Sequence, residues 1–354
     1  MKIIHITATH LNKYGGIPVV LEKLVKYQNE IKDVQSIVLS VKNDVKNINS
    51  KNFKFIPDLE HIKNFISEYK PDVIIFHGIY FLEYIKISKV IKDMNLNYYI
   101  EPHGSFMKQA QDKGKLKKYI ANKTVFNRFI KSAYGYIFLN EQEMKNSLFR
   151  GSNDLIIPNG IDVEDSNVNK SNDSNIKLFF IGRIDINHKG LDILIDNLKR
   201  IDDLKRNFSI DIYGVGNEKD TQFLNDEINK FKNLDISFRG PVYDHEKDNV
   251  LKTNNIMILT SRYEGFPMAI LEALSYGNPC IVTKGTNVKT MIEDNSLGWG
   301  CEYENIAETI LHAVEDYKNN KNFYINKTIE FVNENYSWRL IAEKSIKNLS
   351  EKSN

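Results

Sequence analysis

Two glutamates stand eight residues apart in the run Glu264-Gly-Phe-Pro-Met-Ala-Ile-Leu-Glu272. The apolar spacing after Pro267 predicts a helix over 268–276, because proline suits a first helical turn and Gly277 suits the position just past a helix. Glu264 would then lie on the loop before the helix, and Glu272 about two turns inside it. Backbone N–H groups at a helix start favour an anion, and carboxylates accept hydrogen bonds from hydroxyls. The run therefore suits a ligand with phosphates and hydroxyls, such as a sugar nucleotide.

Two cations, Arg183 and Lys189, follow the first strand expected in the second half of the chain, with five residues between them. Fixed cations stabilise the negative charge that builds on phosphates as a nucleoside diphosphate departs. The chain contains no Asp-x-Asp triplet, so we expect no metal ion held in that way. The alternative is structural: glutamates on a polar helix face and surface cations at the mouth of a helix.

Glycines and histidines mark strand ends in the first half. Gly15-Gly16 follows the first strand and precedes a helix, so the backbone there could approach a phosphate closely, although many turns carry two glycines. His103 ends a strand in Glu101-Pro-His-Gly, and His77 ends another. A histidine in such a place is more often structural than functional. No Gly-x-Gly-x-x-Gly is present, which leaves a nicotinamide cofactor without support.

Composition narrows the class of protein. A length of 354 residues suggests two domains, and 42% hydrophobic with 27% charged residues is ordinary for a globular protein. A formal net charge of +2 argues against nucleic acid as a partner. The two cysteines, Cys280 and Cys301, have no metal-like spacing, and no apolar run approaches the roughly 20 residues of a membrane span. We therefore expect a cytoplasmic location.

Short β-branched or aromatic runs alternate with helical patterns from end to end. Such alternation predicts an α/β fold, with parallel strands and helices on both faces. The expected helices include 17–29, 81–94, 190–199, 221–231 and 268–276. The expected strands are 2–7, 35–40, 73–76, 97–100 and 136–139 in the first half, and 176–181, 208–213, 235–238, 256–259 and 279–282 in the second.

One break in composition separates the halves. Residues 163–175 are rich in Ser, Asn and Asp and follow Pro158-Asn-Gly-Ile-Asp162, which predicts a linker between two Rossmann-like domains. The sequence thus predicts four parts: residues 1–162, the linker 163–175, residues 176–335 and a C-terminal helix within 336–354.

Taken together, these pieces resemble a known family over nearly the whole chain. The run from Glu264 to Glu272, with its Gly-x-Pro exit after Tyr276, resembles the Glu-x7-Glu signature of retaining glycosyltransferases of the GT-B fold, family 4 type, also called glycosyl transferases group 1. Pro158-Asn-Gly-Ile-Asp162 is similar to the element that closes the family's first domain. Tyr336-Ser-Trp-Arg-Leu-Ile is similar to its C-terminal helix. The resemblance implies two Rossmann-like domains facing across a cleft, with the C-terminal helix crossing back to the first domain.

The resemblance also implies roles on the donor side. Arg183 and Lys189 would contact the donor diphosphate, with Gly182 beside them. Glu264 would contact hydroxyls of the donor sugar, and Glu272 the ribose of the nucleotide. The other donor contacts that it implies are mostly main-chain positions: Gly15 and Gly16 near the phosphates, Gly240, Pro241 and Val242 along the nucleobase, and Gly265, Phe266, Pro267 and Met268 around the sugar and β-phosphate.

His103 is the one side chain that the resemblance places opposite the transferred sugar, in the first domain. There it would hydrogen-bond a sugar hydroxyl and help to order the acceptor. His77, at the end of a neighbouring strand, is a weaker candidate for a functional residue at the edge of the cleft.

A basic segment runs from Lys108 to Lys131, with eight Lys or Arg residues, one acid, and aromatic and aliphatic residues between them. One interpretation is a solvated helix whose apolar face packs on its own domain. The other is peripheral docking on the anionic inner face of the cell membrane, where each basic residue contributes about 1 kcal/mol.

The family resemblance implies a retaining, metal-independent hexosyltransferase of cell-envelope polysaccharide biosynthesis, and the wealth of Lys, Asn and Ile favours a bacterial source. It would use a UDP- or GDP-linked donor and a glycan or lipid-linked acceptor, with no cofactor. The alternative is a catalytically silent subunit that binds a sugar nucleotide and supports a partner transferase. Epimerases and phosphorylases share the fold, and nothing in the sequence suggests the pyridoxal-binding lysine that phosphorylases need.

Overall fold

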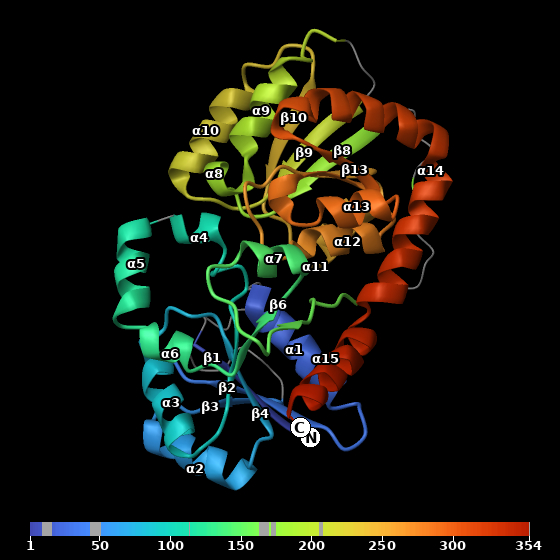
Figure 1. The fold of residues 1–354 in the computed structure, drawn as a ribbon. Helices are drawn as coiled ribbons and strands as arrows, with labels where there is room; N and C mark the ends of the chain where they lie inside the picture. The colour runs from blue at the N-terminus through green and yellow to red at the C-terminus, as the bar shows by residue number, and fades with distance from the viewer. Residues whose placement is uncertain are drawn as a thin grey trace. The chain divides into compact units, whose positions relative to one another are not determined.

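The computed structural model describes residues 1–8, 16–42, 51–112, 114–162, 170, 175–204 and 208–353. The chain divides into two compact units. Unit 1 contains Met1–Gly160 and Tyr336–Asn354, and unit 2 contains Ile161–Asn335. Each unit holds one parallel sheet with helices packed on it (Figure 1), which confirms the expected α/β class. Apart from residues 170 and 175, the expected linker lies outside the described residues.

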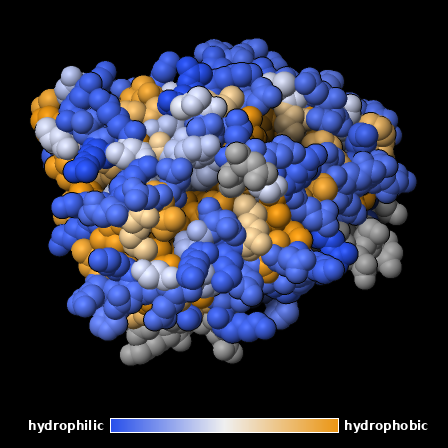
Figure 2. Space-filling model, turned by 60° about the horizontal axis from the view of Figure 1, so that its bottom comes forward, coloured by the Kyte–Doolittle hydropathy of each residue, from blue (hydrophilic) through white to orange (hydrophobic). Residues whose placement is uncertain are grey.

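The face of the protein in Figure 2 is mostly hydrophilic, as expected from a composition that is ordinary for a globular protein. On this face, hydrophobic residues gather in separate patches. In the described ranges, no helix combines the length and the apolar character that crossing a bilayer requires.

Unit 1 has a seven-stranded sheet in the order β3-β2-β1-β4-β5-β6-β7. Its strands are β1 (Lys2–Thr7), β2 (Gln35–Ser40), β3 (Phe53–Phe55), β4 (Val73–His77), β5 (Tyr99–Glu101), β6 (Gly135–Phe138) and β7 (Leu155–Ile156). Its helices are α1 (Gly16–Gln28), α2 (Leu59–Tyr69), α3 (Leu82–Asp93), α4 (Lys108–Asp112), α5 (Lys115–Lys123), α6 (Asn127–Lys131), α7 (Glu141–Asn146) and α15 (Trp338–Ser353).

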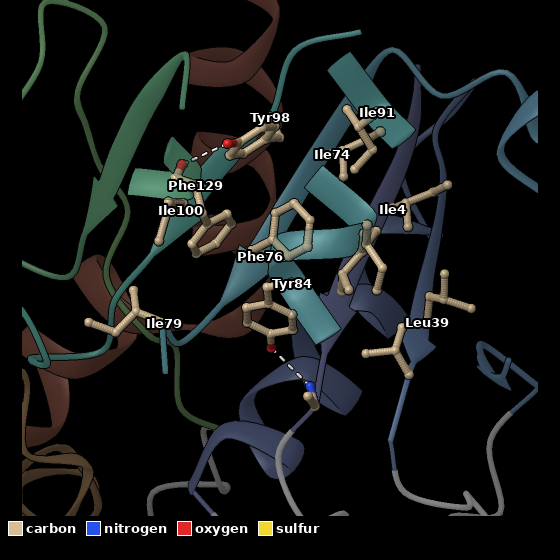
Figure 3. Packing of buried hydrophobic residues seen from close by; sticks show 14 of the residues in the cluster. Ile4, Leu39, Ile74, Phe76, Ile79, Tyr84, Ile91, Tyr98, Ile100 and Phe129 are labelled. Carbon is tan, nitrogen blue, oxygen red and sulfur yellow. Dashed lines mark hydrogen bonds between the residues drawn. The ribbon is translucent and has the colours of Figure 1, made fainter. Parts of the chain in front are cut away.

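Strand alternation gives the sheet of unit 1 two different faces, because successive side chains point to opposite sides. One face packs against α2, α3 and α6, where aromatic and aliphatic residues such as Phe76, Tyr84 and Phe129 form the larger core (Figure 3). The Tyr84 hydroxyl accepts a hydrogen bond from the Ala8 N–H at 2.9 Å, and the Tyr98 hydroxyl donates to the Phe129 carbonyl at 2.6 Å.

On the other face of this sheet lie α1 and α15, which pack side by side (Figure 1). Leu21 and Val25 of α1 form a smaller core with Val38 of β2. The C-terminal helix is therefore part of unit 1, although about 300 residues of chain separate it from α1.

Unit 2 has a six-stranded sheet in the order β10-β9-β8-β11-β12-β13. Its strands are β8 (Ile176–Ile181), β9 (Phe208–Tyr213), β10 (Asp235–Gly240), β11 (Ile256–Leu259), β12 (Cys280–Thr283) and β13 (Gly298–Cys301). Its helices are α8 (Ile186–Lys189), α9 (Leu191–Lys199), α10 (Glu218–Ile228), α11 (Asp244–Thr253), α12 (Met268–Ser275), α13 (Lys289–Asp294) and α14 (Ile306–Tyr336), which is kinked at Asn320.

Helix α12 forms where the sequence predicts it. Ile270, Leu271 and Leu274 are fully buried, so the expected apolar stripe faces the core. Gly277 has a φ of +75° just past the helix, the left-handed conformation that glycine adopts without steric cost. Pro267 differs from the expectation: it is the N-cap residue, in extended conformation, rather than a residue of the first turn.

Candidate active site

Lys189 is fixed by the ends of two adjacent strands of unit 2. It is the last residue of α8, which follows β8 after a short loop and has Asp185 as its N-cap. The Thr260 hydroxyl, just past β11, donates to the carbonyls of Lys189 and Gly190 at 3.1 and 3.0 Å. Gly190 has a φ of +62°, and a Cβ built there would lie 2.2 Å from the Thr260 carbonyl oxygen. The turn therefore requires glycine, and it holds the Lys189 side chain at the carboxyl edge of the sheet.

Glu264 pairs with this lysine. The Lys189 Nζ lies 2.6 Å from Glu264 Oε1, and the two side chains are only 15% and 11% exposed. The Ser261 hydroxyl donates to the same oxygen at 2.6 Å, and the Asn287 amide donates to the backbone carbonyl of Glu264. Among the described residues, Oε1 accepts both hydrogen bonds of this carboxylate, from Lys189 and Ser261. The first glutamate of the run and the second cation of the loop thus belong to one charged network.

Arg183 is oriented by a residue that stands next to Lys189. Its Nη2 lies 3.0 Å from His188 Nδ1, and its side chain is 63% exposed. A guanidinium only donates, so His188 Nδ1 must accept. His188 Nε2 then carries the proton and donates to the Tyr263 carbonyl at 2.8 Å, and the imidazole stacks on the Tyr263 ring at 4.2 Å. Burial lowers the pKa of His188, which Glu264 opposes and Lys189 and Arg183 reinforce. A neutral His188 therefore supports the Arg183 guanidinium.

Glu272, the second glutamate of the run, has a different partner. Its Oε1 lies 2.5 Å from Nζ of Lys247 in α11, so a ribose hydroxyl would have to share the carboxylate with this lysine. Gly240 ends β10 with a φ of +78°, and no atom of the described ranges lies within 4 Å of a Cβ built on it. Pro241 and Val242 follow it in the loop before α11. Phe266 and Pro267 are buried beneath the turn, while Gly265 and Met268 are partly exposed.

The residues expected in the first domain lie in unit 1. Gly15 lies outside the described residues. Gly16 begins α1, and among the described residues nothing lies within 4 Å of a Cβ built on it. His103 follows β5 and has a φ of +48°, a left-handed conformation that is uncommon for a residue with a side chain. Its Nε2 lies 3.0 Å from Nδ1 of His77. The carboxylate of Glu101 lies close to both rings. Among the described residues, His77, Glu101 and His103 form a group that could hold a metal ion.

Several side chains of the site were missed by the sequence analysis. His188 and Ser261 lie one residue before Lys189 and three before Glu264, so proximity to the predicted residues was the available signal. Asn287 and Lys247 are distant in sequence from the residues that they contact. For these two, only the folded sheet shows the relation.

The basic segment folds differently from a single amphipathic helix. It divides into α4, α5 and α6. Phe126, Phe129 and Ile130, at the C-terminal end, are buried, as the structural interpretation requires. In and just after α5, however, the apolar residues are exposed: Leu116 by 72%, Tyr119 by 61%, Ile120 by 52% and Val125 by 47%.

Comparisons with known proteins bear on the family and the fold of this chain. Residues 162–329 match the family described as Glycosyl transferases group 1, a stretch that includes Arg183, Lys189, Glu264 and Glu272. An uncharacterized 41.2 kDa protein in the cps region of Klebsiella pneumoniae is 25% identical over 148 residues, which are 42% of this chain and 38% of that one. The lipopolysaccharide 1,6-galactosyltransferase of Escherichia coli is 25% identical over 64% of this chain and 61% of its own. The chain thus matches less than two thirds of either relative.

The fold of the whole chain is also found among solved structures. The Anabaena protein Alr3699/HepE in complex with UDP-glucose has a TM-score of 0.76 at 16% identity, covering 99% of this chain and 100% of that one. Two units that each hold one parallel sheet with flanking helices agree with the GT-B fold that the family resemblance implies. The chain therefore has the GT-B fold, and its match to the glycosyl transferases group 1 family covers residues 162–329, a little under half of its length.

Proposed function

We propose that this protein is a glycosyltransferase that moves a hexose from a UDP- or GDP-linked donor to a hydroxyl of a cell-surface polysaccharide or lipid-linked glycan precursor. The observation that carries the proposal is the network of Arg183, His188, Lys189 and Glu264. It sets two cations and a carboxylate at one edge of the unit 2 sheet, inside the matched domain. Such an edge, at the carboxyl ends of parallel strands, is where open α/β sheets bind ligands.

The chemistry assigned to this network is leaving-group stabilisation. As the bond between the sugar and the β-phosphate breaks, Arg183 and Lys189 would meet the charge that develops on the diphosphate. Lysine has three N–H donors, and Glu264 accepts from one of them, so Lys189 can bridge that carboxylate and a phosphate. The second oxygen of Glu264 would accept from a sugar hydroxyl. The family resemblance is the basis on which we assign retention of configuration. The two cations are the basis on which we assign metal independence.

The names of similar proteins support the substrate class. The Klebsiella relative is encoded in a cps region, the Escherichia coli relative is a lipopolysaccharide galactosyltransferase, and the Anabaena structure holds UDP-glucose. A sugar nucleotide as donor and an envelope glycan as acceptor are the chemistry common to these names.

We also propose that α5 docks unit 1 on anionic membrane. Its exposed Leu116, Tyr119 and Ile120 are interleaved with the exposed Lys115 and Lys117. Apolar side chains ringed by lysines are the surface that interfacial helices present to lipid headgroups. A lipid-linked acceptor would make such docking useful.

A thermal-shift screen with UDP- and GDP-sugars tests donor binding. A ligand at 100 times its Kd adds about 2.7 kcal/mol of stability, which is a readily measured rise in Tm. We expect one nucleotide class to stabilise the wild type and to lose its effect in Lys189→Ala. If no nucleotide sugar shifts Tm at millimolar concentration, the proposed function is wrong.

A further inference from the structure

Five polar side chains form a continuous chain of hydrogen bonds beneath α1 and α15 of unit 1. Strand alternation places His5 of β1 and His77 of β4 on this face, because Ile4 and Ile6 of β1 belong to the core on the opposite face. His5 and His77 are fully buried, as are Gln28 of α1 and Ser345 of α15. The chain of hydrogen bonds ends at His103, whose side chain is 11% exposed.

The first link determines how the Gln28 amide lies. The Ser345 hydroxyl donates its only hydrogen to the Ala342 carbonyl at 2.7 Å. Toward Gln28, at 3.0 Å, Ser345 can therefore only accept, so the Gln28 NH₂ group faces α15. The Gln28 carbonyl oxygen then faces the sheet, where the Ser36 hydroxyl lies 2.6 Å from it.

The second link determines the tautomer of His5. Its Nε2 lies 3.1 Å from the Gln28 oxygen, which only accepts, so Nε2 carries a proton. A neutral imidazole has one N–H, so His5 Nδ1 accepts. Burial lowers the pKa of His5 to about 4 and that of His103 to about 4, and it lowers the pKa of His77 well below the ordinary range. All three rings are therefore neutral near pH 7.

The remaining links repeat the same reasoning. His77 Nε2 lies 2.9 Å from His5 Nδ1 and must donate to it, which leaves His77 Nδ1 as an acceptor. His103 Nε2 lies 3.0 Å from His77 Nδ1 and must donate in turn. The proton of a neutral His103 is thus on Nε2, and its Nδ1 has a lone pair. In the part of the chain that the structure describes, no hydrogen bond is made to that Nδ1.

Two acidic residues, Glu101 and Glu143, lie near the histidine end of this chain of hydrogen bonds. Glu101 lies 3.4 Å from His77 Nδ1 and 3.5 Å from His103 Nε2, and burial, reinforced by Glu143, raises its pKa well above the usual range. The raised pKa favours the neutral carboxyl of Glu101, and a neutral carboxyl does not force a proton onto His77 Nδ1. Glu143 accepts from the backbone N–H groups of Gly104 and Leu139, at 2.5 and 2.7 Å, rather than from a histidine.

A bound metal ion is the competing account of the same cluster. Tetrahedral zinc, with bonds of about 2.0–2.1 Å, needs ligand atoms roughly 3.3 Å apart, and the three separations here are 3.0, 3.4 and 3.5 Å. Zinc would require His103 Nε2 to lose its proton. The 3.0 Å separation between the two ring nitrogens is an ordinary hydrogen bond that needs no ion.

We call this chain of hydrogen bonds, which runs from Ser345 of α15 to His103, the relay. We propose that the relay fixes His103 as its Nε2–H tautomer, so that the Nδ1 lone pair accepts a hydrogen bond from a ligand hydroxyl. Ser345, Gln28, His5 and His77 are then positioning residues for His103. The identity of the hydroxyl, on the donor sugar or the acceptor, rests on the proposed function; the tautomer does not.

Long-range ¹H–¹⁵N spectra of the full chain, labelled with ¹⁵N-histidine and without ligand, measure the tautomer directly. The signals are assigned with His77→Gln and His103→Gln. We expect the Nε2–H form at His5, His77 and His103 near pH 7, with no change down to about pH 5. An Nδ1–H form or an imidazolium at His103 would overturn the proposal. So would stoichiometric zinc, found by metal analysis and lost in His77→Gln.

Matched variants then test the relay itself. Gln28→Met removes the acceptor that fixes His5, and Ser345→Ala removes the group that fixes Gln28. In both, we expect a mixture of tautomers at His103 and about a tenfold fall in donor turnover, the loss of roughly one hydrogen bond. Ser350→Ala, an exposed serine of the same helix, is the control and should change neither.

The readouts separate this proposal from the proposed function. If Gln28→Met folds and its His103 keeps a single Nε2–H tautomer, the relay has no role. If the tautomer is as stated but no donor is turned over, the relay stands and the proposed function is wrong.

Discussion

At the scale of single residues, the site of unit 2 depends on neighbours that hold its charges in place. Lys189 is held by Glu264 and by the Thr260 hydroxyl behind its carbonyl, and Arg183 is held by a neutral His188. Cations that are already oriented before a ligand arrives stabilise developing charge without further reorganisation. The arrangement therefore favours a role in stabilising a leaving group over a role in stability alone.

Arg183→Ala and Lys189→Ala should each slow sugar transfer by about 10²–10³-fold, because each removes an oriented cation from the leaving diphosphate. Steady-state kinetics with the best donor measures this. Lys219→Ala, at an exposed lysine of α10, is the matched control. A denaturation curve is needed for Lys189→Ala, because loss of Lys189 leaves the largely buried Glu264 unpaired. Near-normal turnover by both site variants would refute their assignment.

The buried His5 should make unit 1 sensitive to acid. Its pKa is about 4 in the folded protein and 6.5 in the unfolded chain, so between these values the unfolded state binds more protons and stability falls as pH falls. His5→Gln removes this term. Relative to the variant, the wild type should lose about 2 kcal/mol between about pH 7 and pH 5.

Urea denaturation at both pH values checks this, with His61→Gln, at an exposed histidine, as the control. An identical pH dependence for wild type and His5→Gln would show that His5 is not held neutral in the fold.

At the scale of secondary structure, the sequence was most informative where strands are long and apolar. The strands 2–7, 35–40, 176–181, 208–213 and 256–259 were predicted with the bounds that they have in the structure, since β-branched runs of that length leave little choice. Strands β3, β7 and β13, of two to four residues, were missed, because their pairing rather than their composition defines them. Similarly, the exposure of Leu116 follows from where α5 packs, which periodicity does not encode.

Charge reversal in α5 tests the docking proposal. Lys115→Glu with Lys117→Glu should release the protein from vesicles that contain anionic lipid, because each basic residue contributes about 1 kcal/mol near such a surface. Lys118 is left unchanged, since its Nζ donates to the Ala110 carbonyl. Vesicle sedimentation at several salt concentrations measures the binding, which should weaken as salt rises.

Lys63→Glu with Lys89→Glu, at exposed lysines of α2 and α3, is the control and should leave sedimentation unchanged. If the wild type does not bind anionic vesicles even at low salt, α5 is only a solvated helix.

At the scale of the whole molecule, the alternation of elements predicted two parallel sheets, and the structure has them. What the sequence could not supply was the relation between distant segments. Ser345 meets Gln28 across more than 300 residues of chain, and Lys247 meets Glu272 from a separate helix. Contacts of this kind depend on the order of strands and on helix packing, which local patterns do not specify.

Donor turnover by the full chain should survive EDTA, because Arg183 and Lys189 supply the positive charge that a metal ion would otherwise bring to the diphosphate. The measurement is the rate with and without chelator. Complete loss of activity in EDTA, restored by Mg²⁺ or Mn²⁺, would show that these cations do not replace a metal.

The most direct test of glycosyl transfer is release of nucleoside diphosphate by the purified wild type from the sugar nucleotide that stabilises it most. Slow hydrolysis by water needs no acceptor, so an unidentified acceptor does not prevent the measurement. We predict repeated turnover, which Lys189→Ala reduces about 10²–10³-fold. Tight donor binding with no release of diphosphate over many hours would contradict the account and would leave a silent sugar-nucleotide-binding subunit in its place.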